Sequence, residues 1–196
     1  MSDSLSPEAL QRLFTEARSF SSFSDRAVPA ALLRQVFELA RMGPTAQNSQ
    51  PARFVFVTSV EARARLLTAV VPGNVPKVRA APVTAIVAID TRFHEEMPTL
   101  WHDAALPARL AANPALSDAT ARRNGTLVGA YLMLAARALG LDCGPMSGFD
   151  AQKVDTEFFP DGRWRSNFLC NIGYGDRGAL KPRQRRLEFD EACRVI

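Results

Sequence analysis

The sequence predicts an α+β or α/β fold in which helices cover a mixed β-sheet. Segments with apolar residues at helical spacing alternate with short runs of β-branched and aromatic residues. This alternation is typical of helices packed on a central sheet. The chain has 196 residues, of which 47% are hydrophobic, which suffices for one buried core but not for two domains. We therefore expect residues 1–196 to form a single domain.

Several segments carry start or stop signals for helices. The first helix is expected to begin at Ser6-Pro7-Glu8, where serine can cap the helix and proline suits its first position. The second follows Val28-Pro29 and stops at Gly43-Pro44. Further helices are predicted over residues 61–70, 118–139 and 150–158, the last capped by Asp150.

Residues 118–139 are predicted to form the central core helix. Gly125, Gly129 and Ala130 leave room for a neighbouring backbone to approach closely. The residues expected to face the core together are Leu127, Tyr131, Leu134, Ala135 and Ala138.

The segments that resemble strands are short and apolar. Residues 53–58 (RFVFVT) and 166–172 (SNFLCNI) are rich in β-branched and aromatic side chains. Residues 83–89 (VTAIVAI) form an apolar run of the kind that is buried on both faces of a sheet. A short strand or extended turn is predicted over residues 141–146. Residues 92–116 mix histidines, prolines and polar residues, and are predicted to form a mobile or partly helical insert.

Composition and charge disfavour several classes of protein. The formal net charge is +4, but the arginines form no basic helix face interleaved with aromatic residues, so nucleic-acid binding is not expected. No stretch is long and apolar enough to span a bilayer, and the polar start MSDSLSPEAL does not resemble a secretory signal. We expect a soluble, cytoplasmic protein without membrane contact. The odd set Cys143, Cys170 and Cys193 predicts buried free thiols and no disulfide framework.

Three further patterns could indicate a dinucleotide-binding motif, a metal site and a nucleic-acid patch, but neighbouring residues argue against each interpretation. Residues 173–178 (GYGDRG) match the GxGxxG pattern of dinucleotide-binding folds, but a proline-containing segment follows where a helix should begin. His94 and His102 lie near acidic residues, yet the second histidine of HExxH is missing, so no metal is expected. The cluster Arg183–Arg186 is expected to be a solvated tail or a phosphate clamp rather than a nucleic-acid patch.

The most informative polar stretch is residues 43–54 (GPTAQNSQPARF), which joins a predicted helix to a predicted strand. Its hydroxyl, amide and backbone N–H groups suit a capped turn, and they also suit a loop that holds a ligand. The residue types alone leave both interpretations open.

This stretch resembles the P-S-x-x-N-x-Q-P-W-x-F segment of the nitroreductase family, and other motifs of that family recur in order. Residues 17–23 (ARSFSSF) resemble its R-S-x-R-x-F element, residues 73–77 (GNVPK) its N-x-x-K element, and residues 145–149 (PMSGF) its P-x-x-G-F loop. Residues 171–175 (NIGYG) and Lys181-Pro182-Arg183 resemble its closing strand, turn and basic pair. Each motif is weak alone, but together they cover nearly the whole chain.

The resemblance implies a three-layer fold with a mixed central sheet flanked by helices, and an intertwined homodimer with FMN at the subunit interface. It implies that Arg18, Lys181 and Arg183 bind the FMN phosphate, with Ser19 and Ser21 of the same N-terminal motif also at the cofactor. It implies that Asn74 and Lys77 meet the pyrimidine edge of the flavin ring.

The remaining residues that the resemblance implies lie in two loops. Pro145, Met146, Ser147 and Gly148 pass beside the ring, with a backbone N–H directed toward its N5 atom. Pro44, Thr45, Ala46, Asn48 and Gln50 reach the flavin from the partner subunit. Two positions depart from the family pattern, because Ser21 replaces a basic residue and Ser147 stands where many relatives carry an acid.

Each of these residues also has an ordinary structural interpretation. Taken without the resemblance, Arg18 suits a solvated position at a helix C-terminus, and Lys77 suits a surface loop. Residues 145–148 likewise suit a simple Gly/Pro turn.

Within the family, residues 137–150, 171–176 and 185–192 most resemble the malonic semialdehyde reductase branch, which is linked to pyrimidine degradation. That likeness implies reduction of malonic semialdehyde to 3-hydroxypropionate by ping-pong hydride transfer from NADH or NADPH. A broad nitro or quinone reductase and a flavin-binding module without turnover are the alternatives. No catalytic side chain is expected, because the cofactor transfers the hydride. The proton can come from water, a ribityl hydroxyl or a residue of the insert 92–116.

Overall fold

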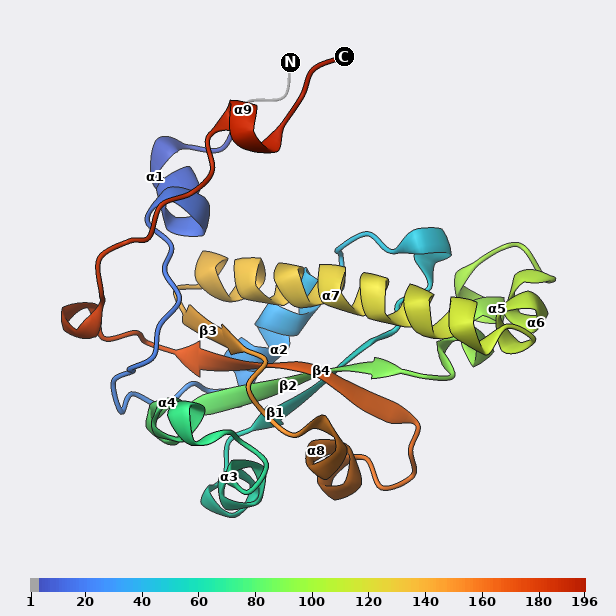
Figure 1. Cartoon of the computed structure of the whole chain (residues 1–196), viewed down its shortest axis with the longest axis horizontal. Coiled ribbons are helices and arrows are strands. Elements are labelled where there is room, and N and C mark those ends of the chain that lie inside the picture. The colour runs from blue at the N-terminus through green and yellow to red at the C-terminus, as the bar shows by residue number, and fades with distance from the viewer. Residues whose placement is uncertain (1–3) are drawn as a thin grey trace.

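The computed structural model describes residues 4–196 and shows a four-stranded sheet between two layers of helices (Figure 1). The strands are β1 (Ala52–Val57), β2 (Val83–Asp90), β3 (Asp142–Met146) and β4 (Trp164–Gly173), in the spatial order β1-β2-β4-β3. One face carries α2 (Ala30–Ala40) and α7 (Pro114–Ala138). The other face carries α3 (Val60–Leu67), α4 (Val75–Ala80) and α8 (Ala151–Phe158). The predicted three-layer α+β architecture is confirmed.

The remaining elements are short. The helices are α1 (Pro7–Leu10), α5 (Met97–Leu100), α6 (Leu106–Ala111) and α9 (Phe189–Ala192), and a π-helical turn spans Gln11–Thr15. Single 3₁₀ turns span Ala46–Asn48, Pro72–Asn74, Phe93–Glu95 and Arg177–Ala179. Both predicted caps are present, because the Ser6 hydroxyl accepts from the backbone N–H of Ala9 at 3.2 Å and the Asp150 carboxylate accepts from that of Lys153 at 3.1 Å.

The sheet differs from the mixed sheet that was expected, because all three pairs of neighbouring strands are antiparallel. The chain leaves β1 at Val57 and enters β2 at Val83, and these residues lie at the same end of the sheet, where Val57 pairs with Thr84. A parallel pairing occurs within residues 4–196 only as the isolated bridge between Ser19 and Cys143. The helices between β1 and β2 return the chain to the end of the sheet where β1 finished. This return makes the two strands antiparallel.

Two apolar layers enclose the inner strand β2, which is buried along its whole length as predicted. Val83, Ala85 and Val87 pack against α2 and α7, whereas Ile86 and Ala88 pack against α3 and α8. This alternation is the two-residue period of a strand that is covered on both faces.

The predicted buried face of α7 is largely wrong. Leu127 and Tyr131 are 47% and 39% exposed, although Ala135 is buried. The face of α7 that packs on the sheet is instead the one that contains Gly125 and Gly129. A Cβ at these positions would lie 2.4 Å from Ile89 and 2.6 Å from Phe168, respectively. The predicted close approach is therefore confirmed at Gly125 and Gly129, where side chains of the sheet fill the space, but not at Ala130, which is exposed. This approach rotates the larger apolar side chains outward.

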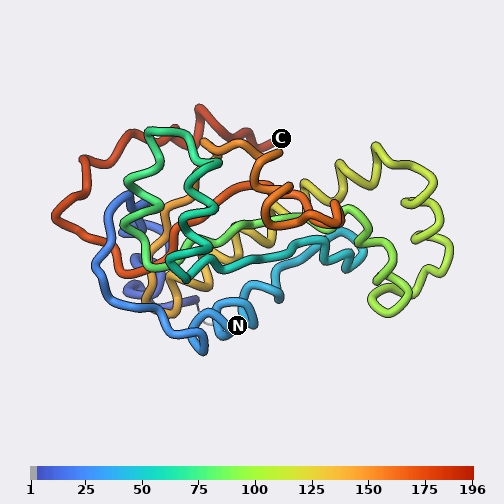
Figure 2. The backbone as a smooth tube through the Cα atoms, turned by 90° about the horizontal axis from the view of Figure 1, so that it is seen from below, coloured from blue at the N-terminus to red at the C-terminus, as the bar shows by residue number. Residues whose placement is uncertain are grey.

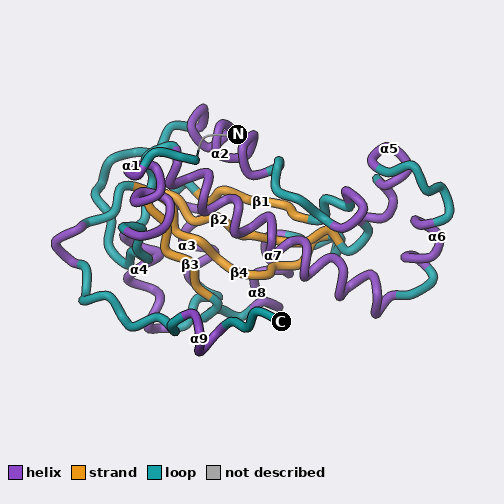
Figure 3. Tube along the Cα trace, turned by 90° about the horizontal axis from the view of Figure 1, so that it is seen from above, coloured by secondary structure: helices purple, strands orange, loops and turns teal. Residues whose placement is uncertain are grey.

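The insert is partly helical and forms its own small core. Its elements are the turn Phe93–Glu95 and the helices α5 and α6, which project beyond one end of the sheet (Figures 2 and 3). Phe93, Met97, Leu106 and Leu110 pack with Ile89 of β2 and Ala121 of α7. This cluster fixes the insert on the sheet end.

After β4 the chain is mostly irregular. Residues 173–178 lead into the 3₁₀ turn Arg177–Ala179 and not into a long helix, so the dinucleotide-binding interpretation of GYGDRG has no structural support. Residues 181–196 are exposed throughout, α9 included. No helix within residues 4–196 has both the length and the apolar surface that crossing a membrane requires.

The cysteines divide into a buried pair and one exposed residue. Cys143 and Cys170 are free and buried, as predicted, but Cys193 is exposed, so the prediction of three buried thiols is wrong for the tail. A hydrogen bond with Cys143, together with burial, raises the pKa of the Cys170 thiol well above its ordinary value. Thiol reactivity depends on the thiolate and on access, so only Cys193 should react in the folded protein.

We expect a disulfide reagent that reports free thiols to label one cysteine per chain under native conditions. Unfolding in urea should expose the remaining two of the three cysteines. The variant Cys193→Ser should abolish the native signal and leave the signal in urea reduced by one thiol. Rapid native labelling of Cys193→Ser would show that the sheet does not protect Cys143 and Cys170.

Candidate functional site

The edge strand β3 positions the N-terminal motif. Ser19 bridges to Cys143, and the backbone N–H of Phe20 donates to the Cys143 carbonyl at 2.9 Å. Phe20 and Phe23 are buried against Ala81, which anchors the segment by its aromatic residues. Arg18, Ser19 and Ser21 are thereby left at the surface beside β3.

Beyond the other end of β3, three predicted residues form a chain of hydrogen bonds. The Nζ of Lys77 donates to Oδ1 of Asn74 at 2.8 Å, and Nδ2 of Asn74 donates to the Gly148 carbonyl at 3.2 Å. A Cβ at Gly148 would lie 2.5 Å from Nδ2 of Asn74, so only glycine permits this contact. Lys77 is half-buried and makes no ion pair with another residue of 4–196.

Two buried polar residues, Asn171 and Thr84, hold the backbone of Lys77 in place. The sequence motifs had assigned no role to either side chain. Nδ2 of Asn171 donates to the backbone carbonyl of Lys77 at 2.9 Å, and the Thr84 hydroxyl donates to Oδ1 of Asn171 at 2.7 Å. Both side chains are fully buried. Buried polar groups of this kind are retained where a hydrogen bond satisfies them, so this pair fixes α4 on the sheet. Their signal in the sequence is a polar residue inside an otherwise apolar strand.

The predicted phosphate ligands gather around a small cavity of about 140 Å³. Arg18, Ser19, Ser21 and Lys181 line it, together with Asp176. The Arg18 guanidinium donates to the Lys181 carbonyl. The side chains of Arg18 and Lys181 make no ion pair among residues 4–196, so their positive charge remains available to an anion.

Arg183 lies next to this cavity and ties the tail to the N-terminal segment. Its Nη2 donates to the carbonyls of Thr15 and Ala17 at 2.7 and 2.9 Å. These bonds use one end of the guanidinium and hold Arg183 beside Arg18. The structure therefore places Arg18 and Lys181 at one cavity, whereas Arg183 is bonded to the adjoining backbone and is not part of the cavity lining.

The loop Pro44–Gln50 lies elsewhere and has an unusual backbone. Gln47, Asn48 and Gln50 have φ angles of 51°, 50° and 40°, in the left-handed region that non-glycine residues seldom adopt. The backbone N–H of Ala46 donates to Oδ1 of Asn124 at 2.8 Å, and the backbone N–H of Gln50 donates to the Thr45 hydroxyl at 3.2 Å. These bonds stabilise the strained loop in one shape.

The same loop contacts the insert. Nδ2 of Asn48 donates to the Leu100 carbonyl at 3.0 Å, and Nε2 of Gln50 donates to Oδ1 of Asn48 at 2.9 Å. Thr45, Asn48 and Gln50 line a cavity of about 670 Å³ together with Leu100 and Trp101 of the insert.

Within one chain the loop and Lys77 lie at opposite ends of β2. Asn171, which holds the Lys77 carbonyl, bonds to Thr84, whereas the Pro51 carbonyl next to the loop accepts from the N–H of Asp90 at 2.8 Å. The length of strand from Thr84 to Asp90 is about 20 Å. One copy of the chain therefore brings together the predicted residues around β3 but not the residues of the loop.

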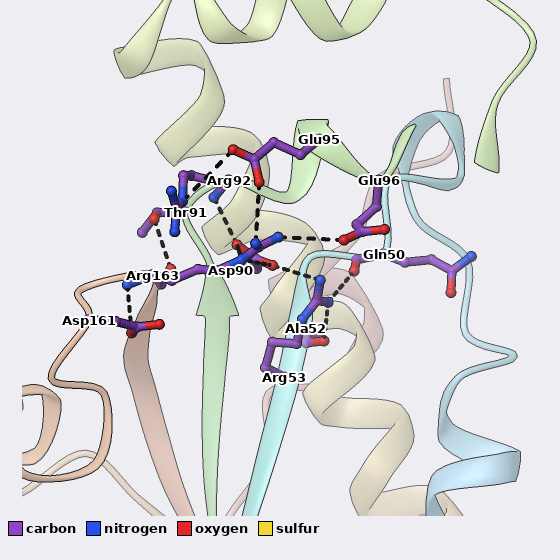
Figure 4. A network of polar contacts seen from close by, with 10 residues as sticks. All are labelled: Gln50, Ala52, Arg53, Asp90, Thr91, Arg92, Glu95, Glu96, Asp161 and Arg163. Carbon is purple, nitrogen blue, oxygen red and sulfur yellow. Dashed lines mark hydrogen bonds and ion pairs between the residues drawn. The ribbon is translucent and has the colours of Figure 1, made fainter. Parts of the chain in front are cut away.

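A charged network that the sequence analysis missed holds the base of this loop (Figure 4). Asp90 is 1% exposed and accepts from Nη2 of Arg53 at 2.8 Å and from Nε of Arg163 at 3.1 Å. Nη1 of Arg53 also donates to the Gln50 carbonyl at 2.9 Å. The buried carboxylate is thus paired from two sides, and one of its partners fixes the backbone of Gln50.

Arg163 extends the network to the insert. Its guanidinium lies 3.3 Å from Glu95 and 3.5 Å from Glu96. The hydrogen bond and the charge of Asp90 raise the pKa of Arg163 above its ordinary value. The network therefore joins three segments that are far apart in the sequence, namely β1, the end of β2 with the adjoining insert, and Arg163 just before β4. The signal that could have pointed to it is Asp90, a charge directly after an apolar strand.

The histidines do not gather with acids into a metal site. Within residues 4–196 there is no group of three or more His, Cys, Asp or Glu side chains placed to hold a metal ion. The polar chemistry of the described site is therefore that of cations, amides and hydroxyls along β3.

Known proteins match the whole of this architecture. The model of the nitroreductase family matches residues 15–174. A protein of Rhodopseudomonas palustris (strain TIE-1) named "Putative NADH dehydrogenase/NAD(P)H nitroreductase" is 53% identical over 196 residues, which is 100% of both chains.

Two solved structures share the fold. A nitroreductase family protein from Streptococcus pneumoniae TIGR4 has a TM-score of 0.84 and 27% identity, covering 95% of this chain and 100% of its own. A protein from Exiguobacterium sibiricum 255-15, described as a "putative nitroreductase in complex with FMN", has a TM-score of 0.84 and 19% identity, covering 100% of both chains. From the family match and the full-length identity, the chain belongs to the nitroreductase family.

Proposed function

We propose that this protein is an FMN-dependent NAD(P)H oxidoreductase that acts as a homodimer and reduces a small electrophile, with malonic semialdehyde as the preferred candidate. The observation that carries the proposal is the placement, at both ends of β3, of cations that form no ion pair within residues 4–196. Lys77 lies at one end, and Arg18 and Lys181 lie at the other. The name of the Rhodopseudomonas palustris relative and the FMN in the Exiguobacterium sibiricum structure support the same activity.

The residues present fit FMN. From Gly144, beside the N-terminal motif, to Gly148, beside Asn74, the chain spans about 13 Å if extended. This suits a ligand whose phosphate and flat ring are joined by a five-carbon chain. Lys181 and Ser21 both line the cavity of about 140 Å³ beside Arg18, which we call the phosphate cavity. Lys181 supplies a second cation there, where Ser21 offers only a hydroxyl. Cations and hydroxyls at that end suit a phosphate.

FMN, when bound, supplies the hydride acceptor and donor, so the chain needs no side-chain nucleophile. The Lys77 ammonium would lie beside the pyrimidine edge of the ring, where it favours negative charge. Asn74 fixes the position of Nζ, and Asn171 fixes the backbone of Lys77. Ser147, which is exposed, would lie beside the ring without adding a negative charge.

A second copy of the chain would complete the site. Pro44, Thr45, Ala46, Asn48 and Gln50 of the partner subunit would reach the ring that the β3 residues of the first subunit hold. The apolar side chains that α2 and α7 leave exposed, among them Phe37, Leu39, Leu127 and Tyr131, support a partner on this face.

Two further features support intertwining of the subunits. A groove of about 720 Å³ lies between α2 and the unpaired edge of β1, with Leu33, Phe37, Phe54 and Phe56 in its lining. Residues 181–196 form an exposed, largely extended tail. An extended tail and an open strand edge suit each other, because a segment added there would satisfy the free backbone groups of β1.

We expect Lys77→Ala to slow reduction of bound FMN by NADH or NADPH about tenfold to a hundredfold, because it removes a charge-assisted interaction with the reduced ring. Stopped-flow absorbance of the flavin measures this step directly. Lys153→Ala is the matched control, because Lys153 is exposed on α8 and its ion pair with Asp150 is long, at 3.8 Å. Equal reduction rates in Lys77→Ala and wild type would remove Lys77 from the proposed role.

Leu127→Glu should convert the dimer to a monomer and release FMN, because it places a charge on the apolar face of α7 proposed to meet the partner. Size-exclusion chromatography with light scattering and flavin absorbance measures both results. Val60→Glu is the control, because Val60 is 76% exposed on α3, in the opposite helical layer. A monomer that keeps full flavin occupancy would contradict the shared site.

The substrate is tested by steady-state oxidation of NADH and of NADPH with malonic semialdehyde, nitroaromatics and quinones. The proposal expects the highest kcat/KM with malonic semialdehyde. Preference for nitroaromatics or quinones would reject that substrate and favour a broad reductase. FMN binding without turnover on any of them would favour a binding module.

A further inference from the structure

A separate cavity of about 260 Å³ lies where the insert meets the first turns of α7 and the end of the sheet. Figure 3 shows α6 and the beginning of α7 at this end of the molecule. We call it the insert cavity. Its lining includes the polar residues His94, Ser117, Asp118 and Arg165 and the apolar residues Leu110 and Ala121. None of the residues predicted to bind FMN lines it.

Ser117 presents an unused hydroxyl to this cavity. The residue is 6% exposed, and its Oγ is buried without a hydrogen-bond partner among residues 4–196. A hydroxyl inside a helix commonly bonds to a carbonyl of the preceding turn, as Thr126 does to the Arg122 carbonyl at 2.8 Å. Ser117 does not, although it lies in the same helix. Buried polar atoms are seldom left without a partner, so this hydroxyl points to a ligand.

His94 supplies a second unused polar atom. Its Nδ1 is buried and has no hydrogen-bond partner within the described residues. A neutral imidazole can carry its proton on Nδ1 and donate from it. The insert cavity therefore has two potential donors, from the insert and from α7, that no group in the described part of the chain satisfies.

The charges around the cavity favour an anion. Arg165 lies on β4 and makes no ion pair with any residue of 4–196. The one acid in the lining, Asp118, is already paired with Arg122 on the same helix at 2.8 Å. The positive end of the α7 dipole also lies here, because α7 begins at Pro114.

We propose that the insert cavity binds a small carboxylic acid with a short hydrocarbon chain. The Ser117 hydroxyl, the His94 imidazole and the Arg165 guanidinium bind the carboxylate, while Leu110 and Ala121 pack against the chain. The cavity is several times larger than the roughly 30 Å³ that one water occupies, so it admits an organic ligand. A lining that combines apolar side chains with polar donors suits a short fatty acid better than inorganic phosphate.

Such a ligand would stabilise the position of the insert on the sheet end. Leu110 and Ala121 also belong to the small apolar cluster that holds the insert on the sheet end. The other side of the insert contributes Leu100, whose carbonyl accepts from Asn48. Occupation of the insert cavity would therefore stabilise the insert against the loop Pro44–Gln50 without touching the residues around β3.

The test is an NMR titration of the ¹⁵N-labelled full-length protein with sodium butyrate, with sodium chloride at matched ionic strength as the reference. We expect saturable shifts confined to the lining of the insert cavity. Ser117→Ala and Arg165→Gln should each raise Kd about tenfold, because each removes a hydrogen bond to a charged group. Arg123→Gln removes an exposed charge from α7 outside the lining and should leave Kd unchanged.

Three results would overturn the proposal. The first is the absence of saturable shifts in the lining up to tens of millimolar butyrate. The second is an equal loss of affinity in Arg165→Gln and Arg123→Gln, which would indicate general charge attraction. The third is tighter binding of inorganic phosphate than of butyrate. The readout needs neither flavin nor reductase activity, so its failure is distinct from failure of the proposed function.

Discussion

Asp90→Ala should lower the free energy of unfolding by about 3 kcal/mol, because it leaves two arginines without the buried carboxylate that pairs them. Arg53 and Arg163 contact Asp90 at 2.8 and 3.1 Å, and their own side chains are 23% and 26% exposed. Partial access to water lets both guanidinium groups recover some hydration, which places the expected loss at the low end for a broken buried pair. Urea unfolding followed by circular dichroism, at a fixed protomer concentration, measures the change.

The control for this variant is Asp103→Ala. Asp103 is exposed and lies 3.9 Å from Arg109, so its removal should change the free energy of unfolding by at most about 1 kcal/mol. The variant Asp90→Asn keeps the shape of the side chain and should fall between the two. If Asp90→Ala were as stable as Asp103→Ala, the network in Figure 4 would not stabilise the fold.

The same variant connects stability with the proposed site. Arg53 donates to the carbonyl of Gln50, whose backbone has a φ angle of 40°. Loss of Asp90 frees Arg53 to move, and the strained loop then loses one of the bonds that hold its shape. We therefore expect Asp90→Ala to weaken FMN binding at the proposed dimer site as well as the fold.

The sequence predicted those features that depend on neighbouring residues. Apolar periodicity located the strands and most helices, and the caps at Ser6 and Asp150 identified helix starts. The motif residues Asn74, Lys77 and Gly148 could be recognised for the same reason, because each belongs to a short local pattern. The structure then showed that they are bonded to one another.

Features that depend on distant residues could not be predicted. The ion pair between Asp90 and Arg163 joins positions 73 residues apart, and the bond between Thr84 and Asn171 joins positions 87 apart. The buried face of α7 was misassigned because the helix has two apolar stripes, and the choice between them depends on how closely Gly125 and Gly129 let it approach the sheet. Strand direction likewise follows from where the helical connections return, which no local pattern encodes.

Gly144→Ala should disturb the fold and the proposed phosphate site together. A Cβ at this position would lie 2.1 Å from the backbone oxygen of Phe20, so the N-terminal segment must move away from β3. That movement breaks the 2.9 Å bond from the Phe20 N–H to the Cys143 carbonyl. We expect a loss of about 2 kcal/mol in the free energy of unfolding, the scale of an overpacked core.

The effect on the cofactor follows from the same displacement. Arg18, Ser19 and Ser21 flank Phe20, so moving this segment separates them from Lys181 across the phosphate cavity. We expect the Kd for FMN, measured by fluorescence titration where the variant is still folded, to rise about tenfold, which corresponds to one lost charge-assisted bond. A normal FMN affinity in a destabilised Gly144→Ala variant would show that cofactor binding does not depend on the position of the N-terminal segment.

Gly73→Ala provides the stability control, because a Cβ at Gly73 would have no atom within 4 Å. It should leave the free energy of unfolding nearly unchanged, whereas Gly144→Ala should not. The comparison isolates the close contact between β3 and Phe20 from the general cost of replacing a glycine. If both variants were equally stable, the N-terminal segment would have room to shift, and its position beside β3 would not depend on Gly144.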